Sequence, residues 1–410
     1  MSDTPLTTQC CIAGGGPAGM MLGFLLARAG VRVVVLEKHP DFLRDFRGDT
    51  VHPSTLELIH ELGLLEDFLK LPHRTVDRLS LQVGKQRIQL IDLTHLPTQC
   101  KYIALMPQWD FLNFLADNGR RYKQFDLRMR AEVTDLIEEA GRIVGVRVHT
   151  PDGELTVRAD LVVGCDGRHS TVREKAGLQT DDYGAPMDAL WFRITRRDSD
   201  GADVFGHIEA GALLVMLDRG DHWQCAYVIP KGGIDRVKAD GIETFRNRVI
   251  ALSPFLADRV GELKSFDDIK LLSVMVNRLR QWWRPGLICI GDAAHAMSPI
   301  GGVGINIAVQ DAVATANCLA APLRAGTVGT DDLQAVQARR DFPARMTQQI
   351  QLTMQNRIIG PALQGTREPK PPLLFKLFDA FAILRRIPAR LLALGIRPEH
   401  VRTPDIGAAG

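Results

Sequence analysis

Three glycine-rich stretches, each placed directly after an apolar run, are the residues of this chain best suited to chemistry. They read GGGPAG at 14–19, CDGRHSTVR at 165–173 and GDAAHAMSPIGGVGIN at 291–306. A glycine turn that opens a helix presents unpaired backbone N–H groups and a partial positive charge to a phosphate. The stretches therefore indicate nucleotide binding.

The first stretch belongs to a strand–helix–strand unit of Rossmann type. An apolar run at 9–13 precedes it, a helix is expected at 20–29, and the β-branched run at 31–37 reads as a buried parallel strand. In such units the glycines permit a tight turn, a close approach to pyrophosphate and tight helix packing, and a later acid bonds ribose hydroxyls. The expected nucleotide contacts are Gly14, Gly16, Ala18, Gly19, Glu37 and Lys38.

The ordered set of three stretches resembles the FAD-dependent aromatic hydroxylases, the single-component flavoprotein monooxygenases similar to para-hydroxybenzoate hydroxylase. The resemblance covers residues 8–345 and is weak within 186–280, where substrate is chosen. It implies that Asp166 and Gly167 lie against the FAD pyrophosphate, in a loop linked to pyridine-nucleotide binding. It also implies that Gly291 and Asp292 form the turn whose aspartate bonds the ribityl chain.

Further site residues follow from the resemblance. It places Arg47 near the ribityl and phosphate groups, Gln108 against FAD, and the Val133 backbone at the adenine. The remaining residues lie in the third stretch: the flavin-facing Gly302, Gly304, Ile305 and Asn306, of which the last two donate backbone N–H bonds to the ring, and Pro299 and Gly301, assigned as catalytic because the oxygen adduct forms beside them.

Two histidines near these motifs are not assigned to the chemistry. His295 is expected to be structural, and His52 either borders the flavin or bonds to backbone. Ser298 departs from the proline that many relatives carry, which bears on the stiffness of the loop.

The implied reaction uses FAD as resident cofactor and NAD(P)H as a transient reductant. Hydride passes to the flavin, dioxygen adds at carbon C4a, and the hydroperoxide hydroxylates an electron-rich aromatic or heteroaromatic ring. A general base near neutral pKa would help to ionise a phenol. His207, His222 and Tyr227 are candidates, and none is assigned as catalytic.

The expected fold is α/β, a Rossmann-type FAD-binding domain with an inserted antiparallel β-sheet and C-terminal helices. We assign 1–75, 100–185 and 281–345 to a discontinuous FAD-binding domain. Residues 76–99, with a hairpin around Gly84, and 186–280 alternate in polarity and are assigned to the substrate-binding sheet. Residues 346–410 are assigned to a C-terminal helical region.

The amino-acid composition limits the classes of molecule that the protein is expected to bind. Lys plus Arg (50) nearly balance Asp plus Glu (48), so nucleic acid is not expected. Seven cysteines without a CxxC give no metal site and suit a reducing cytoplasm. The N-terminus is not a signal peptide and no apolar run spans a bilayer. Small aromatic substrate and dioxygen are the expected partners of a cytoplasmic monomer or homodimer.

A last apolar helix is expected at 373–387, within the segment 371–394. Lys376, Asp379 and Arg386 would share one face of it. Such a helix suits packing on the protein body or on a second subunit, and peripheral membrane contact stays open as the alternative.

Other flavoprotein functions require sequence features that differ from those of a hydroxylase. A halogenase would need a WxWxIP tract, whereas Trp282-Trp283 leads into Arg284-Pro285; a disulfide-type reductase would need a CxxxxC on the helix facing the flavin. A reductase of an isoprenoid or quinone-like substrate with the same fold and a non-catalytic flavin-binding protein stay open. Substrate-stimulated NAD(P)H oxidation with dioxygen uptake separates the hydroxylase from both.

Overall fold

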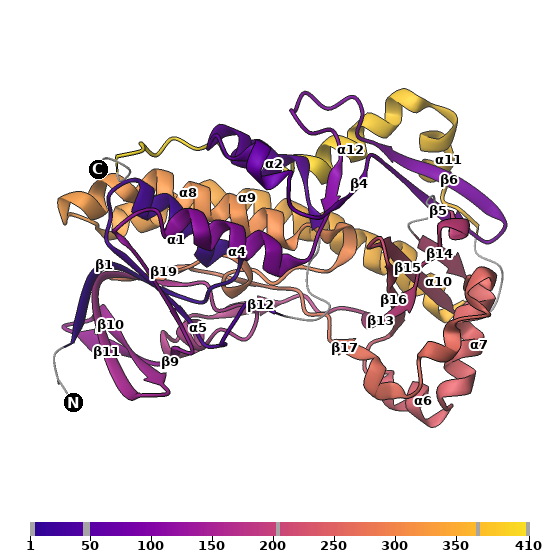
Figure 1. Cartoon of the computed structure of the whole chain (residues 1–410), viewed down its shortest axis with the longest axis horizontal. Coiled ribbons are helices and arrows are strands. Elements are labelled where there is room, and N and C mark those ends of the chain that lie inside the picture. The colour runs from indigo at the N-terminus through magenta and orange to yellow at the C-terminus, as the bar shows by residue number, and fades with distance from the viewer. Residues whose placement is uncertain (1–4, 44–49, 202–205, 366–369, 407–410) are drawn as a thin grey trace.

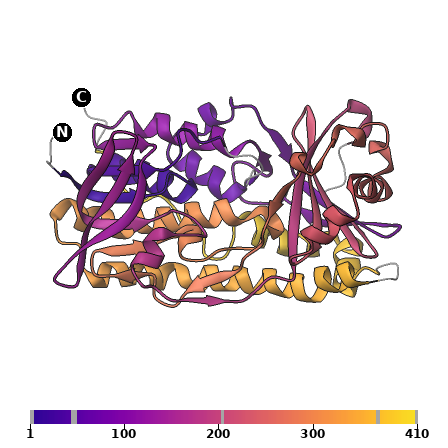
Figure 2. The same ribbon diagram turned by 90° about the horizontal axis from the view of Figure 1, so that it is seen from below.

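The computed structural model describes residues 5–43, 50–201, 206–365 and 370–406. Two large sheets lie at opposite ends of an elongated molecule, and long helices run between them (Figure 1). Seen from below, α8 (Gly304–Ala325) lies beside the first sheet, while α9 (Thr330–Met354) and the helical segment that continues it extend toward the second (Figure 2).

The first sheet has eight strands. Its main path is β19-β20-β11-β1-β2-β8, and β10 and β9 extend it beside β11. The pairs from β20 to β8 along this path are parallel. Its strands are β1 (Leu6–Ala13), β2 (Val33–Glu37), β8 (Phe125–Met129), β9 (Glu132–Glu139), β10 (Arg142–Thr150), β11 (Gly153–Gly164), β19 (Trp283–Arg284) and β20 (Leu287–Cys289).

The register of the parallel strands brings the three glycine-rich stretches to one edge. Ala13 pairs with Gly164 and with Leu36, and Gly164 pairs with Cys289. Each of the three stretches begins within two residues of these strand ends. Ligands of open α/β sheets bind outside the carboxyl ends of the strands, so this edge is where a nucleotide site belongs.

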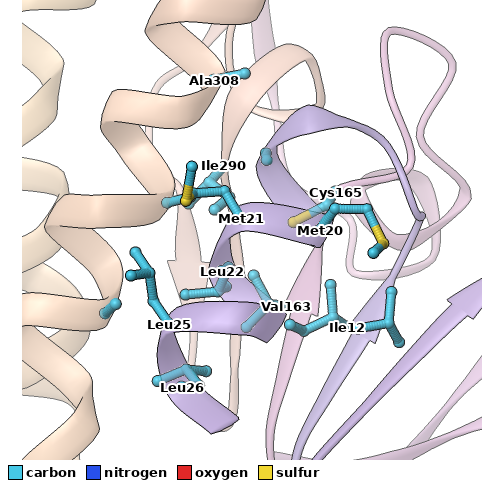
Figure 3. Close-up of a cluster of buried hydrophobic side chains, with 14 of the residues drawn as sticks. Ile12, Met20, Met21, Leu22, Leu25, Leu26, Val163, Cys165, Ile290 and Ala308 are labelled. Carbon is cyan, nitrogen blue, oxygen red and sulfur yellow. The ribbon is translucent and has the colours of Figure 1, made fainter. Parts of the chain in front are cut away.

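Helix α1 (Pro17–Arg28) leaves the first stretch and is buried along nearly its whole length. Its side chains pack between the sheet and α8, with Met20, Leu22 and Leu25 among the fully buried ones (Figure 3). Ile12 of β1, Val163 of β11 and Ile290, which follows β20, meet them from the sheet. The core thus fixes the helix N-terminus at the edge where the strands end, with α4 (Gln108–Gly119) beside α1.

The second sheet has seven strands in the order β17-β13-β16-β15-β14-β5-β6. All its pairs are antiparallel except β14 with β5. Phe245 of a covering helix packs edge-on against Phe192 and Tyr227. The elements are β5 (Arg78–Val83), β6 (Gln86–Asp92), β13 (Met187–Thr195), β14 (Gly206–Glu209), β15 (Ala212–Asp218), β16 (His222–Pro230), β17 (Lys270–Leu272), α6 (Ile234–Ala239) and α7 (Ile242–Leu252).

Two small sheets and several short helices connect these parts. A three-stranded sheet has the order β3-β7-β4, and β12 pairs with β18. The elements are β3 (Thr50–Val51), β4 (Arg74–Val76), β7 (Ile103–Leu105), β12 (Thr180–Asp182), β18 (Asn277–Leu279), α2 (Pro53–Glu61), α3 (Leu65–Phe68), α5 (Thr171–Lys175), α10 (Gly360–Gln364), α11 (Leu373–Ala380) and α12 (Arg386–Ala393).

The α/β class with an inserted antiparallel sheet is confirmed. The strands of the two large sheets divide close to the predicted domain limits, and the partition itself stays a prediction. Its limit at 346 falls inside α9, which is one continuous helix. Among the described helices, the one spanning Ile300–Ala325 has the length and apolarity to cross a membrane, but 83% of its most apolar window is buried, which makes it a core helix.

The prediction of one continuous helix over 373–387 is wrong. Helix α11 ends at Ala380, a 3-10 turn follows, and α12 begins at Arg386. The chain leaves the helix at Phe381, whose backbone is extended (φ -121°, ψ 102°), and Arg385 donates to the Phe378 and Asp379 carbonyls that the end of α11 leaves unpaired. Arg386 therefore does not share a helix with Lys376 and Asp379. The Asp379 carboxylate instead accepts the backbone N–H of Gln89.

A buried histidine fastens α12 to the body. The Nδ1 of His52 lies 2.9 Å from the Leu392 carbonyl oxygen, so Nδ1 carries the proton. Its Nε2 is buried without a partner among the described residues. Burial lowers the pKa of His52 from 6.5 to about 4, because a second proton would place an unpaired charge in the interior.

Acid should therefore weaken the fold through His52. The unfolded chain binds this proton below pH 6.5 and the folded chain only near pH 4, so stability falls as pH drops between these values. At pH 5 the loss from this group is about 2 kcal/mol relative to pH 7. His52→Gln keeps a donor for Leu392 but cannot titrate. Denaturant unfolding at pH 7 and pH 5 should show a smaller loss in the variant; equal losses would contradict the assignment.

Candidate functional site

A cavity of about 660 Å³ lies at the edge where the parallel strands end and extends to the second sheet. Fifteen of the nineteen predicted site residues line it: Gly14, Gly16, Ala18, Glu37, Lys38, Gln108, Val133, Asp166, Gly167, Asp292, Pro299, Gly301, Gly302, Gly304 and Ile305. Gly19, Gly291 and Asn306 do not line it. Arg47 lies outside the described residues.

The glycines of the first stretch are required for different physical reasons. Gly14 has φ +105°, and a Cβ there would stand 2.4 Å from the Cys165 carbonyl oxygen. A Cβ on Gly19 would stand 2.0 Å from the Gly14 oxygen, so this glycine serves the packing of helix on turn. A Cβ on Gly16 would meet nothing within 4 Å, although Gly16 lines the cavity. Protein packing therefore explains why residues 14 and 19 are glycine. It does not explain Gly16, where we expect a ligand to need the space.

Glu37 is buried at the end of β2 and shapes the same turn. Its Oε2 accepts the Gly15 N–H at 2.9 Å, and its Oε1 accepts the His39 N–H at 3.0 Å. A carboxylate that holds two backbone donors is fixed in place. Lys38, the next residue, is exposed and pairs with Glu132 across the cavity rim at 3.9 Å.

The second stretch is held by its own aspartate. Asp166 accepts the Ser170 hydroxyl at 2.5 Å and the Val172 N–H at 3.0 Å, and Ser170 in turn caps α5 by accepting the Arg173 N–H. Burial raises the pKa of Asp166. The two oxygens of this side chain are thus engaged in holding the loop, which is a role that the sequence interpretation did not include.

Arg173 ties the second stretch to the third. Its guanidinium donates to the Ala293 carbonyl at 2.9 Å and to the Arg168 carbonyl at 2.8 Å. The neighbouring Asp292 carboxylate faces the cavity, with Arg168 Nη2 3.7 Å away. A partly exposed acid opposite a cation can exchange this weak pairing for a ligand hydroxyl.

The loop that carries Pro299 and Gly301 is clamped from two sides. Gly301 has φ +77°, and a Cβ there would stand 2.8 Å from Leu392 Cδ1 of α12. Gly302 has φ +63°, and its carbonyl accepts the Thr50 hydroxyl at 2.8 Å. Beyond the loop, the N-terminus of α8 begins at Gly304 without a side-chain cap, so its first N–H groups stay available at the cavity.

Two glutamines, Gln351 of α9 and Gln355 of the π-helical turn that follows it, hold the start of this loop. Gln351 Nε2 donates to the carbonyls of Ser298 and Ile300, both at 2.9 Å, and its Oε1 accepts the Ser298 N–H at 3.2 Å. The Ser298 hydroxyl accepts from Gln355 at 2.8 Å. The serine that departs from the usual proline is therefore anchored by hydrogen bonds rather than by a ring.

Asn306 is buried beneath the loop. Its Oδ1 accepts the His52 N–H at 2.9 Å and the Thr55 hydroxyl at 2.7 Å, while its Nδ2 donates to the Thr50 carbonyl at 3.2 Å. The side chain of Asn306 thus joins α8 to β3 and α2. Since Asn306 does not line the cavity, its predicted backbone bond to a ring stays a prediction.

The second sheet supplies a wall that the sequence interpretation did not identify. It consists of Trp191, Val215, Leu217, Leu271, Leu272 and the polar Gln224 and Ser273. The alternation of the strands indicated one buried face, but no sequence signal shows which buried residues meet a cavity and which meet a helix. Val76, Leu79, Ile103 and Leu105 extend the apolar lining from β4, β5 and β7.

None of the three candidate bases lines the cavity. Tyr227 is buried in the core against Phe245, and burial raises its pKa. His222 pairs with Asp221 at 2.7 Å, and burial lowers the pKa of His207. His295, expected to be structural, is fully buried with Nε2 2.6 Å from Asp311 Oδ2 and also lies outside the lining.

The contrast between Gly19 and Gly16 gives a matched test. Gly19→Ala should lower the free energy of unfolding by about 3 kcal/mol, because a methyl group cannot fit against the Gly14 oxygen. Gly16→Ala should change it by less than about 0.5 kcal/mol. The same substitution should weaken FAD binding about tenfold, which corresponds to about 1.4 kcal/mol of steric conflict. Chemical unfolding of the apoprotein and a flavin titration measure the two effects; equal destabilisation would contradict this division.

Comparison with known proteins agrees with this geometry. The sequence pattern of a family described as FAD binding domain matches residues 7–350. The 6-methylpretetramide 4-monooxygenase of Streptomyces rimosus is 34% identical over 386 residues, which are 93% of this chain and 92% of that protein. Para-nitrophenol 4-monooxygenase of Pseudomonas sp. strain WBC-3 is 26% identical over 81% of this chain and 82% of its own.

Solved structures share the fold. The p-nitrophenol 4-monooxygenase PnpA of Pseudomonas putida DLL-E4 superposes with a TM-score of 0.74 at 22% identity, over 93% of this chain and 97% of that one. The family match covers most of the chain, and the S. rimosus relative matches it nearly end to end. The chain belongs to the FAD-dependent aromatic monooxygenases.

Proposed function

We propose that this enzyme hydroxylates an extended, fused-ring aromatic compound, with NAD(P)H as electron donor and dioxygen as oxygen source. The observation that carries the proposal is that one continuous cavity joins residues of all three glycine-rich stretches to an apolar wall from the second sheet. The name of the S. rimosus relative, a 6-methylpretetramide monooxygenase, supports a multi-ring substrate.

The cavity suits FAD on the evidence of its own residues. Gly16 leaves open space at the N-terminus of α1, which has no side-chain cap and no acidic residue in its first turn. Such a terminus favours a pyrophosphate. Glu37 and Asp292 would take sugar and ribityl hydroxyls, Val133 would lie at the adenine, and the N-terminus of α8 would lie at the ring.

Bound FAD supplies the redox chemistry, accepting a hydride from NAD(P)H and activating dioxygen. The protein positions the reactants and excludes water. Pro299 and Gly301 would border the place where oxygen is transferred, and their loop is held rigid by Gln351 and α12. Trp191, Val215 and Leu217 line the part of the cavity that the second sheet supplies, where an apolar ring would displace water.

The wall from the second sheet also constrains the substrate. Its described lining residues include no Asp, Glu, His, Cys, Lys or Tyr. A substrate there would not meet a protein base from this wall, so we expect a ring whose hydroxyl is acidic enough to ionise unaided. Gln224, whose Oε1 accepts from Arg219 at 2.8 Å, and Ser273 are polar side chains of the wall that can orient it.

Substrate-stimulated turnover tests this function. The FAD-loaded enzyme should oxidise NADH or NADPH slowly alone and faster with an acidic multi-ring phenol, with dioxygen consumed and the product heavier by one oxygen atom. Stopped-assay mass spectrometry and an oxygen electrode measure both. Ring reduction without oxygen uptake would indicate the isoprenoid- or quinone-reductase alternative. Flavin binding without turnover across the aromatic panel would indicate a non-catalytic flavoprotein.

Loop rigidity should control how much consumed oxygen reaches the substrate. Gln351→Leu removes three hydrogen bonds from Ser298 and Ile300. If the loss of these bonds raises the activation free energy of oxygen transfer by about 1.4 kcal/mol, the yield of product per NAD(P)H consumed falls about tenfold. Hydrogen peroxide should rise correspondingly. Gln349→Leu makes the same change at an exposed position of α9 and should keep the coupling of the parent enzyme. Unchanged coupling in Gln351→Leu would contradict this role.

A further inference from the structure

The C-terminal helices carry an unusual concentration of exposed apolar side chains. Thirteen large hydrophobic residues are exposed in the described part of the chain, and seven of them lie between 373 and 391. We call these seven the C-terminal apolar surface: Leu373, Leu374, Leu377, Phe381, Ile383, Ile387 and Leu391. In Figure 1, α11 and α12 lie at the outer edge of the molecule beside β5 and β6.

Each helix already has a separate buried face. In α11, Phe375 is buried in a core cluster, while Leu373, Leu374 and Leu377 lie on the opposite side at helical spacing. In α12, Ala389 and Ala393 are buried, while Ile387 and Leu391 are exposed one turn apart. The apolar surface is therefore a second face, in excess of what packing on the body requires.

The charges beside this surface are positive. Lys370, Lys376, Arg386 and Arg390 are all exposed. At 100° per residue, Lys376 flanks the apolar face of α11, and Arg386 and Arg390 flank that of α12. Asp379 is the one acidic residue between 370 and 397, and its carboxylate already accepts the Gln89 N–H.

We propose that the C-terminal apolar surface binds the interface of an anionic lipid bilayer. Apolar side chains bordered by exposed Lys and Arg suit a surface with hydrocarbon beneath negative headgroups. A second copy of this chain is the less suitable cover, because a two-fold contact would bring the same cations face to face. This inference does not depend on the substrate proposed above.

Membrane contact would place the lipid next to the oxygen-transfer loop. Helix α12 exposes Leu391, while its neighbour Leu392 contacts Gly301 through Cδ1 and accepts the His52 bond through its carbonyl. One short helix thus lies between the proposed lipid surface and the cavity, so a poorly water-soluble aromatic substrate held in the bilayer would be concentrated near the site.

Vesicle flotation of the FAD-loaded, full-length enzyme tests the proposal. It should float with phosphatidylcholine vesicles that contain one part in four of phosphatidylglycerol, and less with pure phosphatidylcholine. Binding should fall as salt is raised, because exposed charges are screened. No flotation with the anionic vesicles at low salt would overturn the proposal.

Matched variants locate the binding surface. Ile387→Gln should weaken partitioning about tenfold, because an apolar side chain no longer enters the bilayer. Ile350→Gln, the same change at an exposed position of α9, should float like the parent protein. Arg386→Gln with Arg390→Gln should weaken binding about fivefold per charge. All variants should retain the flavin absorbance of the folded enzyme.

Two further results would count against the proposal. One is that Ile383→Gln with Ile387→Gln floats as well as the parent protein. The other is a dimer in sedimentation velocity that these substitutions dissociate, which would mean that a second copy covers the surface. A monomer that floats through 373–391 supports it.

Discussion

A buried carboxylate, Asp311 of α8, organises the structure around the site. It is fully buried and accepts from three donors: the Gly291 N–H at 3.0 Å and His295 Nε2 at 2.6 Å, both in the turn after β20, and Arg340 Nε of α9 at 2.8 Å. Burial alone would raise the pKa of Asp311, but His295 and Arg340 outweigh it and hold the pKa below its ordinary value. A buried charge persists only when it is paired this fully, so the turn after β20, α8 and α9 form one unit.

The site edge could be predicted from sequence because it depends on local patterns. An apolar run, a glycine turn and an apolar helix define a parallel strand and its helix, and the carboxyl ends of neighbouring strands must meet. The wall that contains Trp191 and Gln224 could not be predicted from sequence, because it depends on how the second sheet is placed relative to the first. The predicted base candidates show the same limit: Tyr227 and His207 belong to the correct sheet but do not line the cavity.

The structure shows which protein atoms surround each glycine of the motifs, which the sequence alone does not show. Gly16 has space around it, whereas Gly19 is constrained by Gly14, Gly302 by Thr50, and Gly301 by Leu392. The first motif predicts separate roles for its glycines, but it does not show which protein atoms enforce each one. The structure shows these atoms, and it shows that Gly301 and Gly302 meet other parts of the protein and also line the cavity. Asp166 likewise lines the cavity while its oxygens are engaged with Ser170 and Val172.

The contact between Leu392 and Gly301 links the C-terminal helices to the loop where oxygen transfer is proposed. The φ of +77° favours glycine at residue 301, and a Cβ there would also press on Leu392 Cδ1 at 2.8 Å. The loop is thus shaped jointly by α9, through Gln351, and by α12. Because α12 is short and has apolar side chains on its outer face, whatever covers that face also bears on the position of the helix. A cover that shifts α12 would shift the loop on which oxygen transfer depends, while one that holds α12 in place would stabilise it.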